Sequence, residues 1–127
     1  METEGLKLDP QTVRKGVSSV FSEPAKGKYF VAADGDTIAG SMLTTYEWSD
    51  WRNRSFIWIQ SVYVRPEYRG KGLFKQMYGH IKDIVRESSN YAGIRLYVDK
   101  ENHVARQVYR KTGMNPDHYE LYEWIRS

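Results

Sequence analysis

The chain has no cysteine, little histidine and no long hydrophobic run. The missing cysteine excludes disulfide bonds and a thiol nucleophile. The three histidines, His80, His103 and His118, lack the spacing of metal ligands, so we expect no metal. No apolar stretch approaches the ~20 residues of a membrane span, so we expect no membrane partner. The first residues, Met-Glu-Thr-Glu, lack the basic and then apolar order of a signal peptide, which favours a cytoplasmic protein.

The composition is that of one globular domain covering residues 1–127. Hydrophobic residues make up 40% and charged residues 28% of the chain, which is long enough for a proper core. The formal net charge is +3, and basic residues are mixed with acidic ones along the sequence. This small excess is compatible with an anionic cofactor. It does not indicate nucleic acid, which usually binds a clustered basic face.

Hydrophobic periodicity and turn residues predict a mixed α/β or α+β fold in which strands form a meander and then alternate with helices. Asp9-Pro10 is a helix start, and Pro24 ends that helix. Gly113 closes a later helix. We expect strands over 29–33, 37–47, 55–64, 92–98 and 118–125, and helices from residue 10, after residue 72 and over 102–112.

The most informative stretch is 62–74, which reads Val-Tyr-Val-Arg-Pro-Glu-Tyr-Arg-Gly-Lys-Gly-Leu-Phe. A strand leads here into a basic glycine turn at the start of a helix. Gly70 and Gly72 lack Cβ, so the backbone can approach a ligand closely. The first N–H groups of the helix have no partner within it, and the helix dipole adds positive potential. With the charges of Arg69 and Lys71, this arrangement suits phosphate.

Taken alone, the turn is also consistent with a solvated connection between a strand and a helix. It is not a P-loop, because the Gly-x-x-x-x-Gly-Lys-Ser/Thr spacing is absent. It is not a dinucleotide-binding fingerprint, because Lys75 stands at the place of the third glycine. The functional interpretation therefore depends on the strand before the turn and the helix after it.

That context resembles the GNAT (GCN5-related) N-acetyltransferases. Their signature is Arg/Gln-x-x-Gly-x-Gly/Ala after a strand that ends Val-x-Pro, and here Arg69, Gly72 and Phe74 fill those places after Val64. Phe74 departs from the small residue of the signature and should narrow the space above the pyrophosphate.

A second segment, 96–114, resembles the family's later strand and helix. Asn102, Ala105, Tyr109 and Gly113 follow in the family's order. The resemblance runs from about Asp9 to the C-terminus.

The resemblance implies a mixed, mostly antiparallel central sheet flanked by helices, with a splayed strand pair at the cofactor site. The family's fold normally begins with a further strand and helix, and residues 3–8 could be the tail of that helix. Because this sequence begins too late to contain both elements, we expect one edge of the sheet to lack its covering strand. We expect a homodimer, or a rearranged N-terminal segment, to cover it.

The resemblance also implies acetyl-CoA as co-substrate and assigns roles to individual residues. The backbone of Val62 and Val64 would pair with the pantetheine arm, and the Val62 N–H would polarise the acetyl carbonyl. Tyr109 would be the general acid that protonates the departing thiolate. Asn102 would hold the pantetheine amides, cap its own helix, or do both. The pyrophosphate would be held by the turn and the helix start, namely Arg69, Gly70, Lys71, Gly72, Leu73 and Phe74.

The general base is not identified. Trp58 and Gln60 occupy the places where many relatives carry a glutamate. Glu47, Asp99 or an ordered water could accept the proton, and a neutral amine would need no strong base.

The sequence says less about the site that binds the acceptor, the amine that would receive the acetyl group. Three aromatic residues near the expected acceptor cleft could line it or could simply cover the sheet: Tyr46, Trp48 and Trp51. We therefore predict an N-acetyltransferase acting on a primary amine of a small molecule or peptide by direct attack in a ternary complex. The alternative is a catalytically weak or inactive acyl-CoA-binding module of the same fold.

Overall fold

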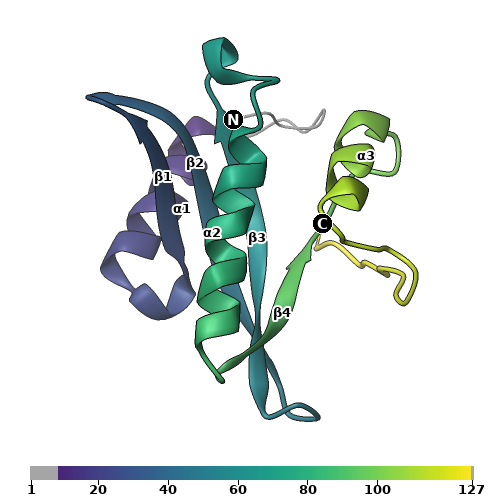
Figure 1. The fold of residues 1–127 in the computed structure, drawn as a ribbon. Helices are drawn as coiled ribbons and strands as arrows, with labels where there is room; N and C mark the ends of the chain where they lie inside the picture. Colours follow the sequence, from purple (N-terminus) through teal and green to yellow (C-terminus); the bar gives the residue numbers. More distant parts are fainter. Residues whose placement is uncertain (1–8, 127) are drawn as a thin grey trace. The chain divides into compact units, whose positions relative to one another are not determined.

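The computed structural model describes residues 9–126, which form two compact units divided between Tyr97 and Val98 (Figure 1). The second unit contains one helix, α3 (His103–Lys111). The first unit contains a sheet, two α-helices and two short 3₁₀ turns: α1 (Pro10–Ser22), η1 (Pro24–Lys26), β1 (Lys28–Asp34), β2 (Thr37–Ser49), β3 (Arg54–Val64), η2 (Pro66–Tyr68), α2 (Leu73–Glu87) and β4 (Tyr91–Leu96).

The four strands form one sheet in the order β1-β2-β3-β4. β1 pairs with β2 and β2 with β3 in antiparallel fashion, whereas β3 and β4 are parallel. The parallel connection contains α2, because a parallel pair needs a crossover. The predicted fold class, a mixed and mostly antiparallel sheet flanked by helices, is confirmed.

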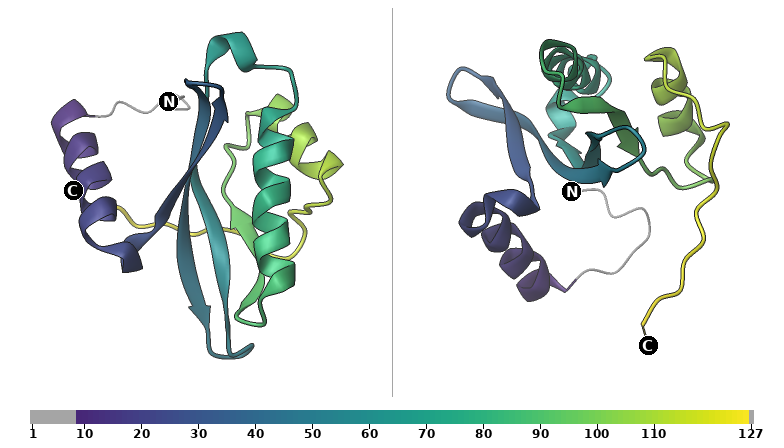
Figure 2. Two further views of the ribbon diagram at one scale, coloured as in Figure 1. Left: turned by 60° about the vertical axis from the view of Figure 1, so that its left-hand side comes forward. Right: turned by 90° about the horizontal axis from the view of Figure 1, so that it is seen from below.

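Two helices cover opposite faces of the sheet. On one face, Phe30 of β1 meets His80 of α2 edge to face, with ring centroids 5.6 Å apart. On the other, Tyr29 stacks with Phe21 of α1 at 5.5 Å. Successive strand residues point to opposite faces, so these neighbouring contacts place α1 and α2 on either side of the sheet (Figure 2).

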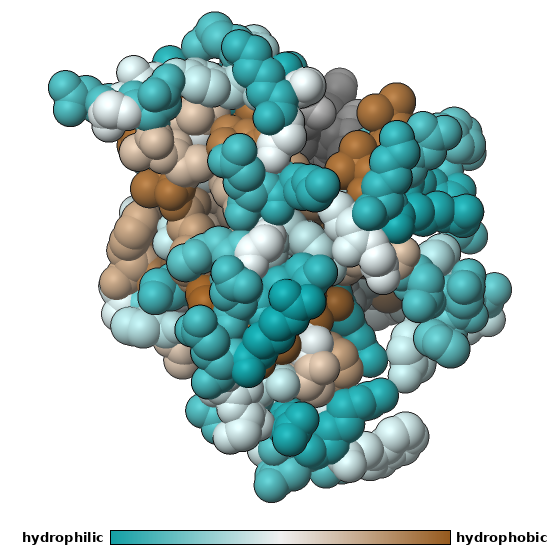
Figure 3. Space-filling model, in the orientation of Figure 1, coloured by the Kyte–Doolittle hydropathy of each residue, from teal (hydrophilic) through white to brown (hydrophobic). Residues whose placement is uncertain are grey.

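The core lies between α2 and the sheet. Met42 of β2 and Ile81 of α2 are almost completely buried, and Ile57, Ile59 and Met77 are also buried. The outward side of α2 carries exposed polar residues such as Lys75. Hydrophilic surface covers much of the face shown in Figure 3. This amphipathic pattern fixes the helix against the strands that lead to the glycine turn.

The predicted helix boundaries are confirmed where capping residues marked them. Asp9 caps α1 by accepting the Gln11 N–H at 3.3 Å, and Pro10 is the first helical residue. At the end of α3, the N–H of Met114 donates to Tyr109 O at 3.2 Å, across Gly113 with φ 92°. This bond is typical of a glycine-terminated helix.

The final strand predicted over 118–125 is wrong. No strand is assigned to this segment among the described residues, and β4 ends at Leu96, short of the predicted residue 98. The segment is rich in aromatic and branched apolar residues, but a strand also needs a partner for its backbone groups. Large apolar side chains such as Tyr122 (88%) and Trp124 (87%) are instead exposed. The helix tail suggested for 3–8 lies outside the described residues.

Replacing Gly40 by alanine should destabilise the sheet beneath α2. A Cβ atom there would lie 2.8 Å from Tyr63 O and 3.0 Å from a methyl carbon of Leu73. Overpacking of this kind costs about 1–3 kcal/mol, which urea unfolding would measure. Gly79→Ala is the matched control, because its Cβ would meet nothing within 4 Å inside α2. The control should gain about 0.5–1 kcal/mol. Equal stabilities for the two variants would contradict the packing described.

Candidate functional site

β3 and β4 part before β3 ends. Their last paired residues are Ile59 and Leu96, whereas β3 continues to Val64, still paired with β2 at Gly40. The register of β2 and β3 shifts at the same point, which leaves Gln60 as an extra residue in β3. Such a bulge bends a strand and increases its twist. Among the described residues, no strand pairs with 60–64 on the side that faces β4 (Figure 1).

The parted side of β3 presents backbone donors at Val62 and Val64. Arg65 donates its N–H to Ala39 O of β2 at 2.8 Å. Because backbone groups alternate in direction along a strand, the N–H groups of Val62 and Val64 point away from β2. The Val64 carbonyl lies on the same side and accepts from Arg69 Nε at 3.0 Å. An extended ligand could therefore pair with β3 as an added strand.

The glycine turn directly follows this edge. Gly70 and Gly72 have φ angles of 75° and 76°, in the left-handed region that favours glycine. Nothing lies within 4 Å of the positions that their Cβ atoms would take. The backbone of the turn is therefore open to the approach of another molecule.

The helix that begins after the turn has an open N-terminus. Gly72 provides no side-chain cap to α2, and the first turn has no acidic residue. Gln76 donates to Gly72 O at 3.1 Å, so the N–H groups before it have no acceptor within the helix. With Arg69 and Lys71 beside it, this end of α2 is suited to an anion.

The side chains around the turn are partly fixed by neighbours. Tyr68 donates its hydroxyl to Asp34 Oδ2 at 2.6 Å, and this bond raises the pKa of Tyr68. Lys71 Nζ lies 6.0 Å from the centre of the Tyr68 ring. Phe74, the residue that departs from the family signature, stacks on Tyr78 at 5.9 Å. A depression of about 430 Å³ beside the turn is lined by Lys71, Leu73 and residues of β1 and β2.

The predicted site residues divide between the two units. Val62, Val64 and the residues from Arg69 to Phe74 lie together in the first unit, on one continuous path from strand to helix. Asn102 and Tyr109 belong to the second unit. Asn102 Oδ1 accepts the Ala105 N–H at 3.1 Å and so caps α3. The half-buried Tyr109 lies in α3. Their roles toward a cofactor stay predictions.

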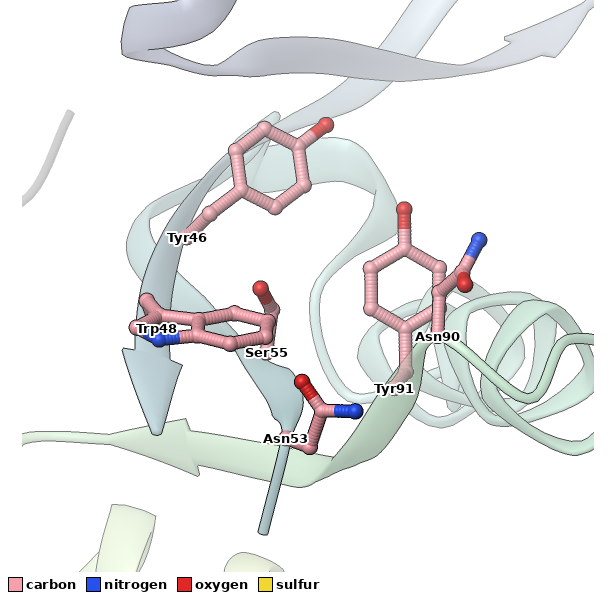
Figure 4. Close-up of a pocket in the computed structure, with 6 residues that line it drawn as sticks. All are labelled: Tyr46, Trp48, Asn53, Ser55, Asn90 and Tyr91. Atoms are coloured by element: carbon pink, nitrogen blue, oxygen red, sulfur yellow. The ribbon is translucent and has the colours of Figure 1, made fainter. Parts of the chain in front are cut away.

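Two of the aromatic residues expected near an acceptor line a separate pocket. Tyr46 and Trp48 border a cavity of about 530 Å³ (Figure 4). The rest of its lining is Asn53, Ser55, Asn90 and Tyr91. Ser55 is at the start of β3, so about 30 Å of strand separates this pocket from the glycine turn. Trp51 is 90% exposed in the hairpin loop.

A hydrogen-bonded cluster that sequence reasoning missed lies on the sheet face opposite α2. Glu47 Oε1 accepts from Trp58 Nε1 at 3.0 Å and from Arg95 at 2.8 Å. Trp58 also packs against Tyr97, with ring centroids 4.5 Å apart. We call Glu47, Trp58, Arg95 and Tyr97 the Glu47 cluster. Three of its members lie on three different strands and Tyr97 directly follows the last of them, and 48 positions separate Glu47 from Arg95, so no local pattern could reveal it.

The cluster makes Glu47 a poor general base. The hydrogen bond from Trp58 lowers the pKa of Glu47 most, and Arg95 lowers it further by its hydrogen bond and charge. A carboxylate held in its charged form accepts a proton less readily. Asp99, another candidate base, accepts the Glu101 N–H at 2.8 Å in the turn before α3.

Neither a membrane span nor a metal cluster is found within residues 9–126. No helix there has the length and apolar character needed to cross a bilayer. The histidines and carboxylates in that range form no group of three or more that could hold a metal ion.

Comparisons with a family model and with a solved structure both identify the same family. Residues 5–114 match the family described as "Acetyltransferase (GNAT) family". A possible acetyltransferase from Clostridium difficile 630, a crystal structure, superposes with a TM-score of 0.91 at 44% identity, over 98% of this chain and 82% of that chain.

Two curated relatives are acetyltransferases named for their substrates. The chain is 36% identical over 101 residues to a streptothricin acetyltransferase of Streptomyces lavendulae, covering 77% of this chain and 50% of that protein. It is 26% identical over 97 residues to a bovine (Bos taurus) thialysine N-epsilon-acetyltransferase, covering 76% and 52%. The chain spans about half the length of these relatives.

The lowered pKa of Glu47 predicts a pH-dependent contribution to stability. The charged carboxylate is favoured in the folded state, so its contribution is full above the ordinary pKa of 4.5 and is lost as pH falls through the lower folded value. Glu47→Gln should therefore lower the melting temperature at pH 7 by more than it does at about pH 2, because more of the carboxylate is protonated at the lower pH. An equal deficit at both pH values would contradict this account.

Proposed function

Since the chain belongs to the GNAT acetyltransferase family, we propose that it is an N-acetyltransferase that moves the acetyl group of acetyl-CoA to a primary amine of a small molecule or peptide. The observation that supports this most is the continuity of the free edge of β3 with the glycine turn. An extended arm ending in a diphosphate needs a strand edge followed by an anion site, and Val62 to Gly72 offer both in that order.

The fit to the diphosphate rests on space and charge. The open Cβ positions at Gly70 and Gly72 allow a phosphate to reach the backbone N–H groups. Arg69 and Lys71 supply positive charge, while the start of α2 supplies N–H groups and its dipole. Leu73 and Phe74 would contribute those first helical N–H groups, as expected from the sequence.

When bound, acetyl-CoA supplies an activated thioester. The amine nitrogen attacks the carbonyl carbon, the C–N bond forms and the C–S bond breaks. The Val62 N–H would stabilise the negative charge that develops on the carbonyl oxygen, an effect worth about 3–4 kcal/mol for one such donor in other enzymes. Tyr109 would give its proton to the departing thiolate. The amine proton would pass to Asp99 or to an ordered water.

A second candidate is an acyl-CoA-binding module with weak or no turnover. The observation that favours it is the lack of an evident base, because Trp58 and Gln60 stand at the family's glutamate places and Glu47 is bonded to Arg95. Both candidates use the same cofactor residues, and an acceptor screen separates them. A homodimer and a cytoplasmic location stay predictions.

Coenzyme A should stabilise the protein, and a carboxylate in the turn should abolish the effect. At 100 times its dissociation constant, the ligand should add about 2.7 kcal/mol, seen as a rise in melting temperature. Gly72→Glu should remove the rise by blocking the backbone and repelling phosphate. Gly35→Glu is the matched control, since Gly35 also has a left-handed φ of 59° with nothing within 4 Å. A normal rise in the Gly72 variant would place the anion site elsewhere.

Tyr109→Phe should lower kcat by about 10²-fold or more while leaving the dissociation constant of acetyl-CoA nearly unchanged, as expected for a lost general acid. Thialysine and streptothricin, for which the curated relatives are named, are the first acceptors to screen. Tyr122→Phe is the control, because Tyr122 is 88% exposed. Unchanged turnover in the Tyr109 variant would remove that residue from the mechanism.

A further inference from the structure

One carboxylate joins three neighbouring strands at the place where two of them are about to part. Glu47 lies in β2, Trp58 in β3 and Arg95 in β4, and both donors bond to the same oxygen of Glu47. Trp58 and Arg95 are themselves register partners, and the pair after them, Ile59 and Leu96, is the last one between β3 and β4. The carboxylate therefore bonds to both strands directly before their separation.

Packing around the carboxylate holds the same strands together. The Arg95 guanidinium lies 3.6 Å from the centre of the Phe56 ring, so this β4 side chain rests on β3. Tyr97, just after β4, packs against Trp58 of β3 with ring centroids 4.5 Å apart and the ring planes tilted by 38°. The Arg95 side chain is 24% exposed and that of Glu47 is 46% exposed, which is more shielded than a fully solvated surface pair. A hydrogen bond to a charged group is roughly twice as strong as one between neutral groups.

After Ile59, β3 is paired with β2 but no longer with β4. Gln60 bulges out of the ladder and donates to Thr45 Oγ1 of β2 at 2.9 Å. Val62 follows four residues after Trp58, about 13 Å along the strand. The direction of its N–H therefore depends on where β4 leaves β3 and on how far the bulge twists the strand.

We propose that Glu47 is a positioning residue: by bonding Trp58 and Arg95 it fixes the point at which β4 leaves β3, and with it the direction of the Val62 N–H. This inference rests on the proposed acetyl transfer, in which that N–H acts on the acetyl carbonyl. Glu47 itself would touch neither substrate. A misplacement of about 1 Å at a reacting group can cost 10²-fold in rate, so a remote clamp of this kind can control turnover.

The test compares Glu47→Ala with Glu47→Gln and with Glu23→Ala. Alanine removes the acceptor of both bonds, whereas the glutamine oxygen can still accept them. Glu23→Ala is the control, because it removes another exposed ion pair, with Lys26 at 3.4 Å, away from the parting strands. In the cofactor-free protein, amide hydrogen exchange of Ile59 and Arg95, whose N–H groups face the partner strand, should become about tenfold faster in Glu47→Ala alone, because their ladder bonds open more often.

In turnover assays, Glu47→Ala should lower kcat about tenfold with the KM of the amine unchanged within about twofold, and Glu47→Gln should recover most of kcat. A normal kcat in Glu47→Ala would overturn the inference, whatever happens to exchange. Faster exchange without a fall in kcat would mean that Glu47 only stabilises the sheet. If the parent bound coenzyme A but acetylated nothing, the proposed function would fail. The inference would then fail with it, even if exchange showed that the clamp itself exists.

Discussion

The separation of β3 from β4 is the constraint on which the rest of the candidate site depends. While two strands are paired, their backbone groups are satisfied by each other and unavailable to a ligand. After Ile59 that pairing stops, and the donors of Val62 and Val64 face the parted side. Pairing with β2 and the packing of α2 keep β3 extended even though one edge is free. The free edge is therefore held in place by the fold and is not a frayed strand end.

Electrostatics along this edge are arranged in two zones. At the glycine turn, the uncapped start of α2 and the side chains of Arg69 and Lys71 give positive potential without a carboxylate in the first helical turn. On the sheet face opposite α2, Glu47 is balanced by Arg95, so that its charge serves strand pairing rather than proton transfer. The candidate anion site at Arg69 and Lys71 is thus separate from the Glu47–Arg95 pair that holds the strands. A substitution in one of them leaves the charged residues of the other in place.

Much of the architecture could be predicted because it is encoded locally. Asp9-Pro10, Gly113 and the spacing of apolar residues in α2 act within a few positions of the chain, and the helices they mark are present. The glycine turn could likewise be predicted from the sequence, since its residues are consecutive. The Glu47 cluster was not, because its contacts join strands far apart in sequence. The strand predicted over 118–125 failed for a related reason: its composition favours a strand, but a ladder partner cannot be predicted from the segment itself.

The most direct test of the central claim is a titration of the ¹⁵N-labelled protein with coenzyme A, followed through its backbone amide resonances. If the parted edge and the glycine turn bind the cofactor, the largest shifts should appear at Val62, Val64 and the amides from Gly70 to Leu73. The resonances of Asn53 and Asn90, in the pocket at the far end of β3, should stay in place. Shifts confined to that far pocket, or none at all at saturating coenzyme A, would contradict the account.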